Sequence, residues 1–355
     1  MKSKELKSEF TFQIDEKHYI KHNYLSFCND VLVDLLRFAD ANKLTNETIK
    51  FANKNDCYVF NKVSEENGDW QEWLLNNGYK DTLYNSYYKH VFFSLVSDFC
   101  SYMLESINCA AKMKVAVSYA LLRKPLKDTL GFIEWLYLDK KEVIDLLVYG
   151  DPKNMEIKRD KAKERTTAIE KIRGYDGFYS FRYDNKSKTS LEHIWNNANH
   201  LITTWNTLSK TKKGNLNFVF ADETILREFS DYYYLVVPAI MMYATDLICD
   251  MFENMGYINI YTQMINKTNR VLKSSFVTGI DGVSHVLDNL DNLTVPIVCP
   301  RCGLKKQISA NHLKKIQYGK FRCPRCRKRI NTNRYIFEWE KVKIIDTINK
   351  DGKEK

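Results

Sequence analysis

The chain has little of what marks a fibrous, mucin-like or disordered protein. It contains only 13 glycines and 6 prolines among 355 residues, and hydrophobic residues make up 44% of the sequence. This composition supplies enough apolar surface to offset the conformational entropy lost on folding, so we expect a globular protein. The length predicts one large or two moderate structural units.

The sequence also lacks long apolar segments. The first fifteen residues, MKSKELKSEFTFQID, contain no apolar core of a secretory signal, so we expect a cytoplasmic protein. The most apolar window covers residues 232–245, and its fourteen residues fall short of the ~20 that a helix needs to span a bilayer. We therefore predict a buried helix there and no membrane partner.

Sequence motifs of several common enzyme classes are missing. The chain has no G-x-x-x-x-G-K-[ST], G-x-G-x-x-G, H-E-x-x-H or G-x-S-x-G, which leaves P-loop, Rossmann, zincin and serine-hydrolase chemistry without support. We assign no catalytic residue. If the helical part held a catalytic site, the first candidates would be four polar residues of one predicted helix: Glu192, His193, Asn196 and His200. The two histidines are seven residues apart, or ~10.5 Å along a helix axis, which is too far to share one metal ion.

Helical spacing of apolar residues dominates from residue 17 to about 254 and predicts a mainly α protein built as a helical bundle. A turn rich in aromatics is expected at 174–188, an isolated strand at 57–63, and a capping box formed by Thr189 and Glu192. The expected helices are 19–41, 69–75, two long antiparallel helices within 87–138 of which the second bends at Pro125, 151–173, 191–205, and 222–255 with a bend at Pro238.

These patterns divide the chain into four parts. A helical domain covers 1–256, within which 1–80 is a candidate subdomain. A connecting segment covers 257–294, a cysteine-containing module covers 295–345, and a charged tail covers 346–355.

Four of the nine cysteines form two copies of the tetrapeptide Cys-Pro-Arg-Cys, at 299–302 and 323–326, with twenty residues between them. Two thiolates on one tight turn bind an ion together, and a second pair completes a tetrahedral site of four sulfur ligands. Gly303 supplies a positive φ after the first pair, whereas Arg327 follows the second, so we expect a looser second turn. Iron in a rubredoxin-like site has similar ligand spacing. The remaining cysteines are scattered, which argues against a disulfide framework: Cys28, Cys57, Cys100, Cys109 and Cys249.

The two tetrapeptides, with strand-like flanks at 295–298 and 335–344, resemble the zinc-ribbon family over about 295–345 only. The resemblance implies a small β module in which Cys299, Cys302, Cys323 and Cys326 hold one structural Zn²⁺. A site closed by four cysteines leaves no position for a catalytic water.

All of the excess positive charge of the chain lies in this module. The stretch from Cys299 to Tyr335 holds twelve lysines and arginines and no acidic residue; removing them changes the balance from 54 − 44 = +10 to 42 − 44 = −2. A concentrated positive patch attracts a polyanion through counterion release. Arg301 and Arg325, inside the two tetrapeptides, are expected to neutralise the metal–thiolate centre. The residues expected to contact nucleic acid are Lys305, Lys306, Lys314, Lys315, Lys320, Arg322, Arg327, Lys328, Arg329 and Arg334.

The segment LLRKPLKDTLGFIEWL at 121–136 is similar to HEPN-type helical bundles, which occur in RNases and abortive-infection proteins. Ribonucleases of that family carry an arginine followed, after four to six residues, by a histidine. None of the seven histidines here follows an arginine at that spacing, which removes the support for RNase activity.

The sequence therefore predicts a cytoplasmic protein that binds nucleic acid through a basic zinc module. Its helical domain would oligomerise or recruit a partner in a regulatory or host-defence role. Two alternatives stay open: a nuclease-like enzyme with its site in the helical domain, and a zinc module that docks onto an acidic protein.

Overall fold

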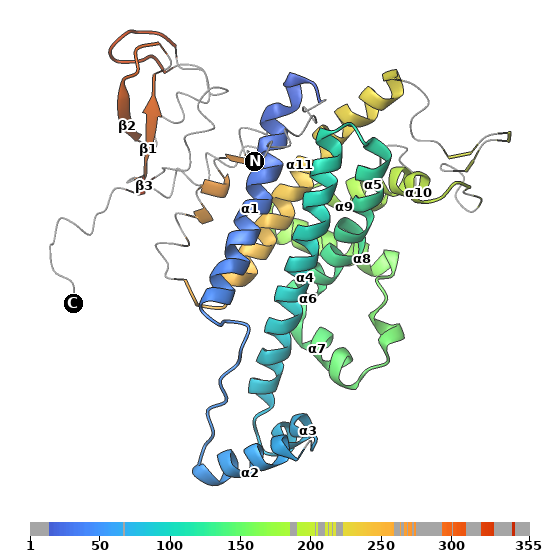
Figure 1. Ribbon diagram of the computed structural model, residues 1–355, viewed down its shortest axis with the longest axis vertical. Helices are drawn as coiled ribbons and strands as arrows, with labels where there is room; N and C mark the ends of the chain where they lie inside the picture. Colours follow the sequence, from blue (N-terminus) through green and yellow to red (C-terminus); the bar gives the residue numbers. More distant parts are fainter. Residues whose placement is uncertain are drawn as a thin grey trace, which may run out of the picture. The chain divides into compact units, whose positions relative to one another are not determined.

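A computed structural model describes most of the helical part of the chain and several short stretches towards the C-terminus (Figure 1). The described residues are 14–66, 68–184, 190–202, 204, 210–211, 213–214, 216–217, 223–258, 263, 266–267, 269–271, 273–274, 293–299, 301–309, 321–329 and 343–344.

The chain forms two compact units. The first comprises Met1–Glu16 and Ser26–Tyr233, and the second comprises Lys17–Leu25 and Tyr234–Lys355. The described residues are mainly α-helical, as the apolar spacing predicted. The helices are η1 (Glu16–His18), α1 (Tyr19–Ala41), α2 (Lys54–Glu65), α3 (Trp70–Asn76), α4 (Lys80–Ala111), α5 (Val115–Arg123), η2 (Lys124–Thr129), α6 (Leu130–Leu138), α7 (Lys140–Tyr149), η3 (Pro152–Met155), α8 (Arg159–Arg173), α9 (Phe178–Tyr183), α10 (Leu191–Asn199) and α11 (Glu223–Glu253).

The core of the first unit is a hairpin of long helices, as predicted for 87–138. Helix α4 contacts α5, η2, α6 and α7 in turn, so the chain runs back along it after a short connection at 112–114. Pro125 has no N–H to donate, and the backbone accommodates it as a π-helical turn, η2, in which Leu130 N–H reaches the Pro125 carbonyl. Leu122, Leu126 and Leu130 are fully buried along this segment.

The strand predicted at 57–63 is wrong, because these residues lie within helix α2. The Asn53 side chain accepts a hydrogen bond from Asp56 N–H and caps the helix, a stronger local signal than the β-favouring residues that follow. The short helix predicted at 69–75 is confirmed as α3, capped by Asp69 and followed by Gly78 with φ +86°. Four aromatic rings pack against one another and link α2 and α3 to the start of α4: Phe51, Phe60, Trp73 and Tyr79.

Two further expectations for the first unit are wrong in their boundaries. Asp151 caps only a short 3-10 turn, η3, and the charged helix begins later, as α8 at Arg159. The aromatic turn expected at 174–188 contains a short helix, α9. Its first two N–H groups, those of Phe178 and Tyr179, donate to the buried carboxylate of Glu170, which explains why a helix forms there.

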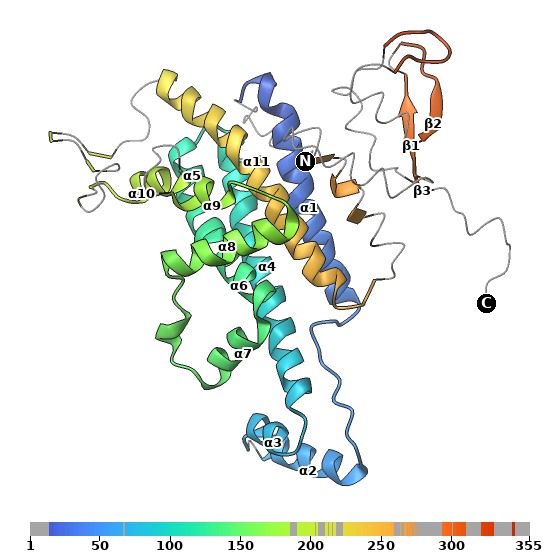
Figure 2. The same ribbon diagram turned by 180° about the vertical axis from the view of Figure 1, so that it is seen from behind.

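Helices α6, α8 and α9 pack together (their ribbons are seen from behind in Figure 2), and a buried ion pair joins α6 to α9. The side chains of Glu134 and Arg182 are 0% exposed. Arg182 donates from Nη1 to Glu134 Oε1 at 2.5 Å and from Nη2 to Oε2 at 3.0 Å, and Thr166 Oγ1 lies 3.2 Å from both oxygens. Glu134 is thus an internal link between three helices.

The second unit includes the first turns of α1 and most of α11. His22 Nδ1 lies 3.1 Å from the hydroxyl of Tyr234, and the ring of His18 stacks on the same tyrosine. Helix α11 is long and apolar enough to cross a membrane, but 78% of its most apolar window is buried within the protein. That burial is typical of a core helix, as predicted for residues 232–245.

Three strands lie in the cysteine-containing part of the chain: β1 (Leu293–Val298), β2 (Lys305–Ser309) and β3 (Lys343–Ile344). They form one antiparallel sheet in the order β2-β1-β3, with Val298 opposite Lys305. The strand expected at 295–298 falls within β1; of the one expected at 335–344, residues 335–342 lie outside the described residues.

Candidate metal centre and the basic surface around it

The two Cys-Pro-Arg-Cys turns have the same backbone geometry. In the first, Gly303 N–H donates to the Cys299 carbonyl at 2.9 Å and Cys299 N–H donates to the Leu304 carbonyl at 3.0 Å. In the second, the corresponding bonds are Arg327 to Cys323 at 2.9 Å and Cys323 to Lys328 at 2.8 Å. Gly303 has φ 66° and Arg327 has φ 58°. The expectation of a looser second turn is therefore wrong, because Arg327 adopts the left-handed conformation despite its Cβ.

These turns bring four sulfur atoms together, all within 4.8 Å of one another. Cys299 Sγ lies 3.5 Å from Cys326 Sγ, and Cys302 Sγ lies 3.7 Å from Cys323 Sγ. These distances are too long for disulfides, whose S–S bond is about 2.05 Å. They are close to the ~3.8 Å edge of a tetrahedron whose corners lie 2.3 Å from a central zinc ion. The four cysteines therefore fit one metal ion of zinc's size.

Neighbouring sulfur atoms shift the pKa values of Cys299 and Cys302 in opposite directions. Burial opposes ionisation of Cys299, but hydrogen bonds from the backbone of Cys302 and Arg301 and from neighbouring thiols lower its pKa. At Cys302 a backbone hydrogen bond from Leu304 favours the thiolate, yet burial and the three other sulfurs outweigh it and raise the pKa. Four thiolates this close repel one another, and a dication at the centre removes that repulsion.

The donor set determines what such an ion can do. Cys299 and Cys323 are buried and Cys302 and Cys326 are half-buried, so the protein surrounds the centre on most sides. Four sulfur ligands fill a tetrahedral coordination sphere and leave no place for a reacting water. The cluster can hold a metal ion such as zinc in a structural role, joining the β1–β2 turn to the 321–329 segment.

Basic side chains cover the outside of this cluster. Eight of the twelve are described, and all eight are exposed: Arg301, Lys305, Lys306, Arg322, Arg325, Arg327, Lys328 and Arg329. None of the eight forms an ion pair with any acidic residue in the described stretches of the chain. Lys305 and Lys306 lie on β2, and Arg322 pairs with Arg329 in an isolated antiparallel bridge. Lys314, Lys315, Lys320 and Arg334 lie outside the described residues.

The four polar residues considered for catalysis differ in their surroundings. Glu192 is buried, and its Oε1 accepts ion pairs from Arg159 at 2.8 Å and Lys127 at 3.2 Å. His193 is also buried, Asn196 is half-buried, and His200 is exposed.

The boundaries of that helix also differ from the prediction. Helix α10 ends at Asn199, whose side chain donates to the Trp195 carbonyl, and His200 already has an extended backbone. The N-terminal cap is Ser190, while Thr189 lies outside the described residues. Leu201 and Ile202, expected on the apolar face, are 63% and 57% exposed.

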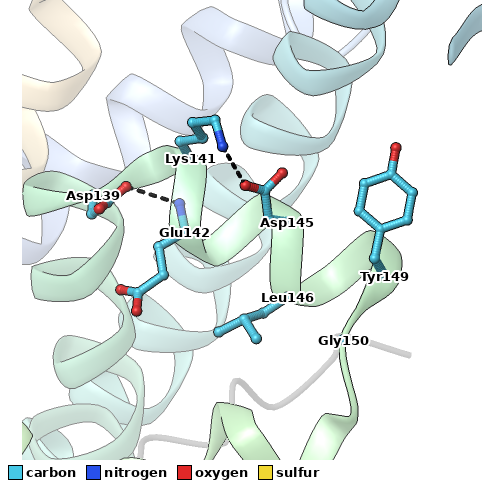
Figure 3. Close-up of a pocket in the computed structure, with 7 residues that line it drawn as sticks. All are labelled: Asp139, Lys141, Glu142, Asp145, Leu146, Tyr149 and Gly150. Atoms are coloured by element: carbon cyan, nitrogen blue, oxygen red, sulfur yellow. Dashed lines mark hydrogen bonds and ion pairs between the residues drawn. The ribbon is translucent and has the colours of Figure 1, made fainter.

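Two hollows that the sequence did not reveal lie beside α7, and Lys141 lines both of them. Lys141 Nζ contacts Asp145 at 2.6 Å, and the hydroxyl of Tyr84 on α4 also donates to Asp145. These bonds, the one from Lys141 first, lower the pKa of Asp145. The hollow shown in Figure 3 has a volume of about 460 Å³ and is lined by Asp139, Lys141, Glu142, Asp145, Leu146, Tyr149 and Gly150.

Comparison with known proteins finds no relative of this chain. No protein-family model matches it, and neither the curated proteins nor the solved structures include a significant match.

Proposed function

We propose that Cys299, Cys302, Cys323 and Cys326 bind one structural Zn²⁺ as a zinc ribbon, and that the basic surface around them binds nucleic acid. The observation that carries this proposal is the set of eight exposed basic side chains with no acidic partner among the described residues. Exposed cations gathered around one small centre repel one another, and an external polyanion would relieve that repulsion.

The charge of the metal centre accounts for only part of this surface. Four thiolates and one Zn²⁺ carry a formal charge of −2, which Arg301 and Arg325, inside the two tetrapeptides, neutralise. Six of the eight described cations then remain, all exposed. A centre that transfers electrons gains nothing from so many unneutralised cations, which favours structural zinc over rubredoxin-like iron.

The number of cations bounds the salt dependence of binding. If all six contact phosphates of a duplex, log K falls with log[salt] with a slope of about −5, because each neutralised phosphate contributes roughly −0.9. A smaller slope indicates fewer contacts. Oligomerisation or partner recruitment by the helical part stays a prediction, as do the cytoplasmic location and the regulatory or host-defence role.

Fluorescence anisotropy of the full chain tests the proposal. Labelled duplex DNA, single-stranded DNA and RNA are titrated at two salt concentrations. The test variant neutralises the basic surface with Lys305→Gln, Lys306→Gln, Lys328→Gln and Arg329→Gln together. We expect the wild type to bind at least one of the three nucleic acids with a steep salt dependence, and the variant to lose most of both affinity and slope.

A matched control distinguishes the effect of neutralising this surface from the effect of lowering the net charge of the chain. It carries four neutralising substitutions at exposed lysines of the helical part: Lys54→Gln, Lys112→Gln, Lys153→Gln and Lys171→Gln. This variant has the same net charge as the test variant and should bind like the wild type. Equal loss in both variants, or no binding by the wild type, would overturn the proposal. Binding of acidic proteins without nucleic-acid binding would instead support a protein-docking module.

A further inference from the structure

A second basic hollow lies in the first unit, between the start of α4 and the start of α7. Its volume is about 420 Å³, within the ~300–1,000 Å³ range of small-molecule sites. Two tyrosines of α4 line it together with three lysines and one aspartate. The full lining is Lys80, Asp81, Tyr84, Asn85, Tyr88, Lys140, Lys141 and Ile144.

The three lysines of this hollow lie at the N-terminal ends of helices, where the helix dipole disfavours a positive charge. Lys80 is the first residue of α4, and Lys140 and Lys141 are the first two residues of α7. Positive side chains in the first turn of a helix oppose its dipole, so an anion between them would be stabilising. Lys141 is held by Asp145 at 2.6 Å. Lys80 and Lys140 make no ion pair with any residue that the structure describes.

Each of these two lysines lies over an aromatic ring. Lys80 Nζ is 5.0 Å from the ring centre of Tyr84, and Lys140 Nζ is 5.3 Å from that of Tyr88. The ring of Tyr84 is held in place because its hydroxyl donates to Asp145. Burial raises the pKa of Tyr88 to about 12, so its ring carries no charge that would repel an anion at neutral pH.

The hollow shown in Figure 3 is a less favourable place for an anion, because more carboxylates line it. Figure 3 shows that Asp139, Glu142 and Asp145 belong to the lining of this other hollow, where Asp145 pairs with Lys141. Lys141 belongs to both linings. The three carboxylates of the other hollow repel an anion more strongly than the single one, Asp81, that lines the α4 side.

We propose that the α4–α7 hollow binds the phosphate group of a nucleotide, with Lys80 and Lys140 as phosphate contacts and Tyr84 as the surface on which the base stacks. An aromatic ring can stack with any of the bases, because every base has a π face. The nucleotide is either a free mononucleotide or the end of a single strand, since the two share this chemistry. This site is independent of the cysteine module.

Isothermal titration calorimetry of the full chain tests the site with uridine 5′-monophosphate, ribose 5-phosphate and inorganic phosphate. In Lys80→Gln/Lys140→Gln we expect uridine monophosphate to bind at least about tenfold more weakly than to the wild type. The matched control is Lys153→Gln/Lys171→Gln, two exposed lysines of the same unit that lie outside the hollow; it should bind like the wild type.

The base contact is tested by two substitutions at one position. Tyr84→Phe loses the hydroxyl bond to Asp145 but keeps the ring, whereas Tyr84→Leu loses both. We expect Tyr84→Phe to retain its preference for uridine monophosphate over ribose 5-phosphate, and Tyr84→Leu to lose it, a change of about fivefold or more. Thermal unfolding of each variant reports whether the fold is retained.

Several results would overturn the proposal. No heat of binding at millimolar uridine monophosphate, or equal affinity in the lysine variant and its control, would remove the site. Equal binding of inorganic phosphate and the nucleotide would remove the base contact. A short single strand, titrated into the full chain carrying the four neutralised residues of the basic surface, shows whether the end of a strand occupies the hollow. This titration tests the hollow even if the cysteine module does not bind nucleic acid.

Discussion

The buried pair Glu134–Arg182 predicts a large loss of stability when only one partner is changed. Glu134→Gln keeps the shape of the side chain but removes its charge. The Arg182 guanidinium, whose side chain is 0% exposed, would then stay buried without the carboxylate that accepts two of its hydrogen bonds. Breaking a buried ion pair in this way typically costs about 3–5 kcal/mol.

That cost is a large part of the stability of an ordinary domain, which is about 5–15 kcal/mol. At about 2–4 °C per kcal/mol for a unit of this size, it corresponds to a fall in Tm of roughly 6–20 °C. Urea unfolding followed by circular dichroism measures the free energy, and differential scanning calorimetry measures Tm. The double substitution Glu134→Gln/Arg182→Met should recover much of the loss, because it leaves no unpaired charge in the core.

The control is the same chemical change on the surface of α8. Glu164 pairs with Lys161 at 2.9 Å, but both side chains are more than half exposed, at 68% and 60%. Surface pairs of this kind contribute about 0–1 kcal/mol, so Glu164→Gln should change the free energy of unfolding very little. If Glu134→Gln costs no more than Glu164→Gln, the interpretation of the pair as an internal link between three helices is refuted.

Three further predictions concern metal content, the second cysteine turn and pH. Elemental analysis of protein purified without added metal should find one zinc per chain, and iron in its place would contradict the structural-zinc assignment. Arg327→Gly should keep that zinc, since Gly303 holds the same conformation in the first turn, and should reduce the salt slope of nucleic-acid binding by about 0.9; an unchanged slope would show that Arg327 contacts no phosphate. Burial lowers the pKa of His22 below its ordinary value of 6.5. As the pH falls below 6.5, His22 therefore becomes protonated in the unfolded chain before it does in the folded one. The free energy of unfolding should then fall by up to about 1.4 kcal/mol per pH unit. His22→Gln should unfold with a weaker dependence between pH 7.5 and 5.5, and an identical slope would exclude His22 as the cause.

Local signals in the sequence predicted several elements of the fold correctly. The apolar repeat predicted α1 over 19–41, and the short helix predicted at 69–75 corresponds to α3. Pro125 was expected to disturb a long helix, and it lies in a π-helical turn. Each of these signals acts through the backbone within a few residues, so the sequence alone is enough to show it.

Contacts between distant residues were beyond the reach of these signals. Helix α10 is shorter than its apolar pattern, and its polar residue Glu192 is buried because Lys127 and Arg159, far along the chain, supply the opposite charge. Glu134 is buried for the same reason, through Arg182. From the sequence alone, a charged residue on a predicted helix is expected at the surface, because its distant partner of opposite charge is not known.

The candidate metal centre was easier to predict than the helical part, because a short repeated motif contains all four of its candidate ligands. Two identical tetrapeptides specify two similar turns, and four sulfurs within 4.8 Å follow from them. The α4–α7 hollow had no such repeat. Its lysines come from the first turns of two helices that are about sixty residues apart, and only the packing of α7 against α4 brings them together.

The most direct test of the central proposal is to measure nucleic-acid affinity before and after the metal is removed. The full chain is titrated with labelled single-stranded and duplex nucleic acid as purified, after treatment with a zinc chelator, and after zinc is restored, with metal content measured each time. If the metal holds the two cysteine turns and their basic side chains in one surface, removal should weaken binding by at least about tenfold and zinc should restore it. Unchanged affinity in protein shown to be free of metal would contradict the proposal.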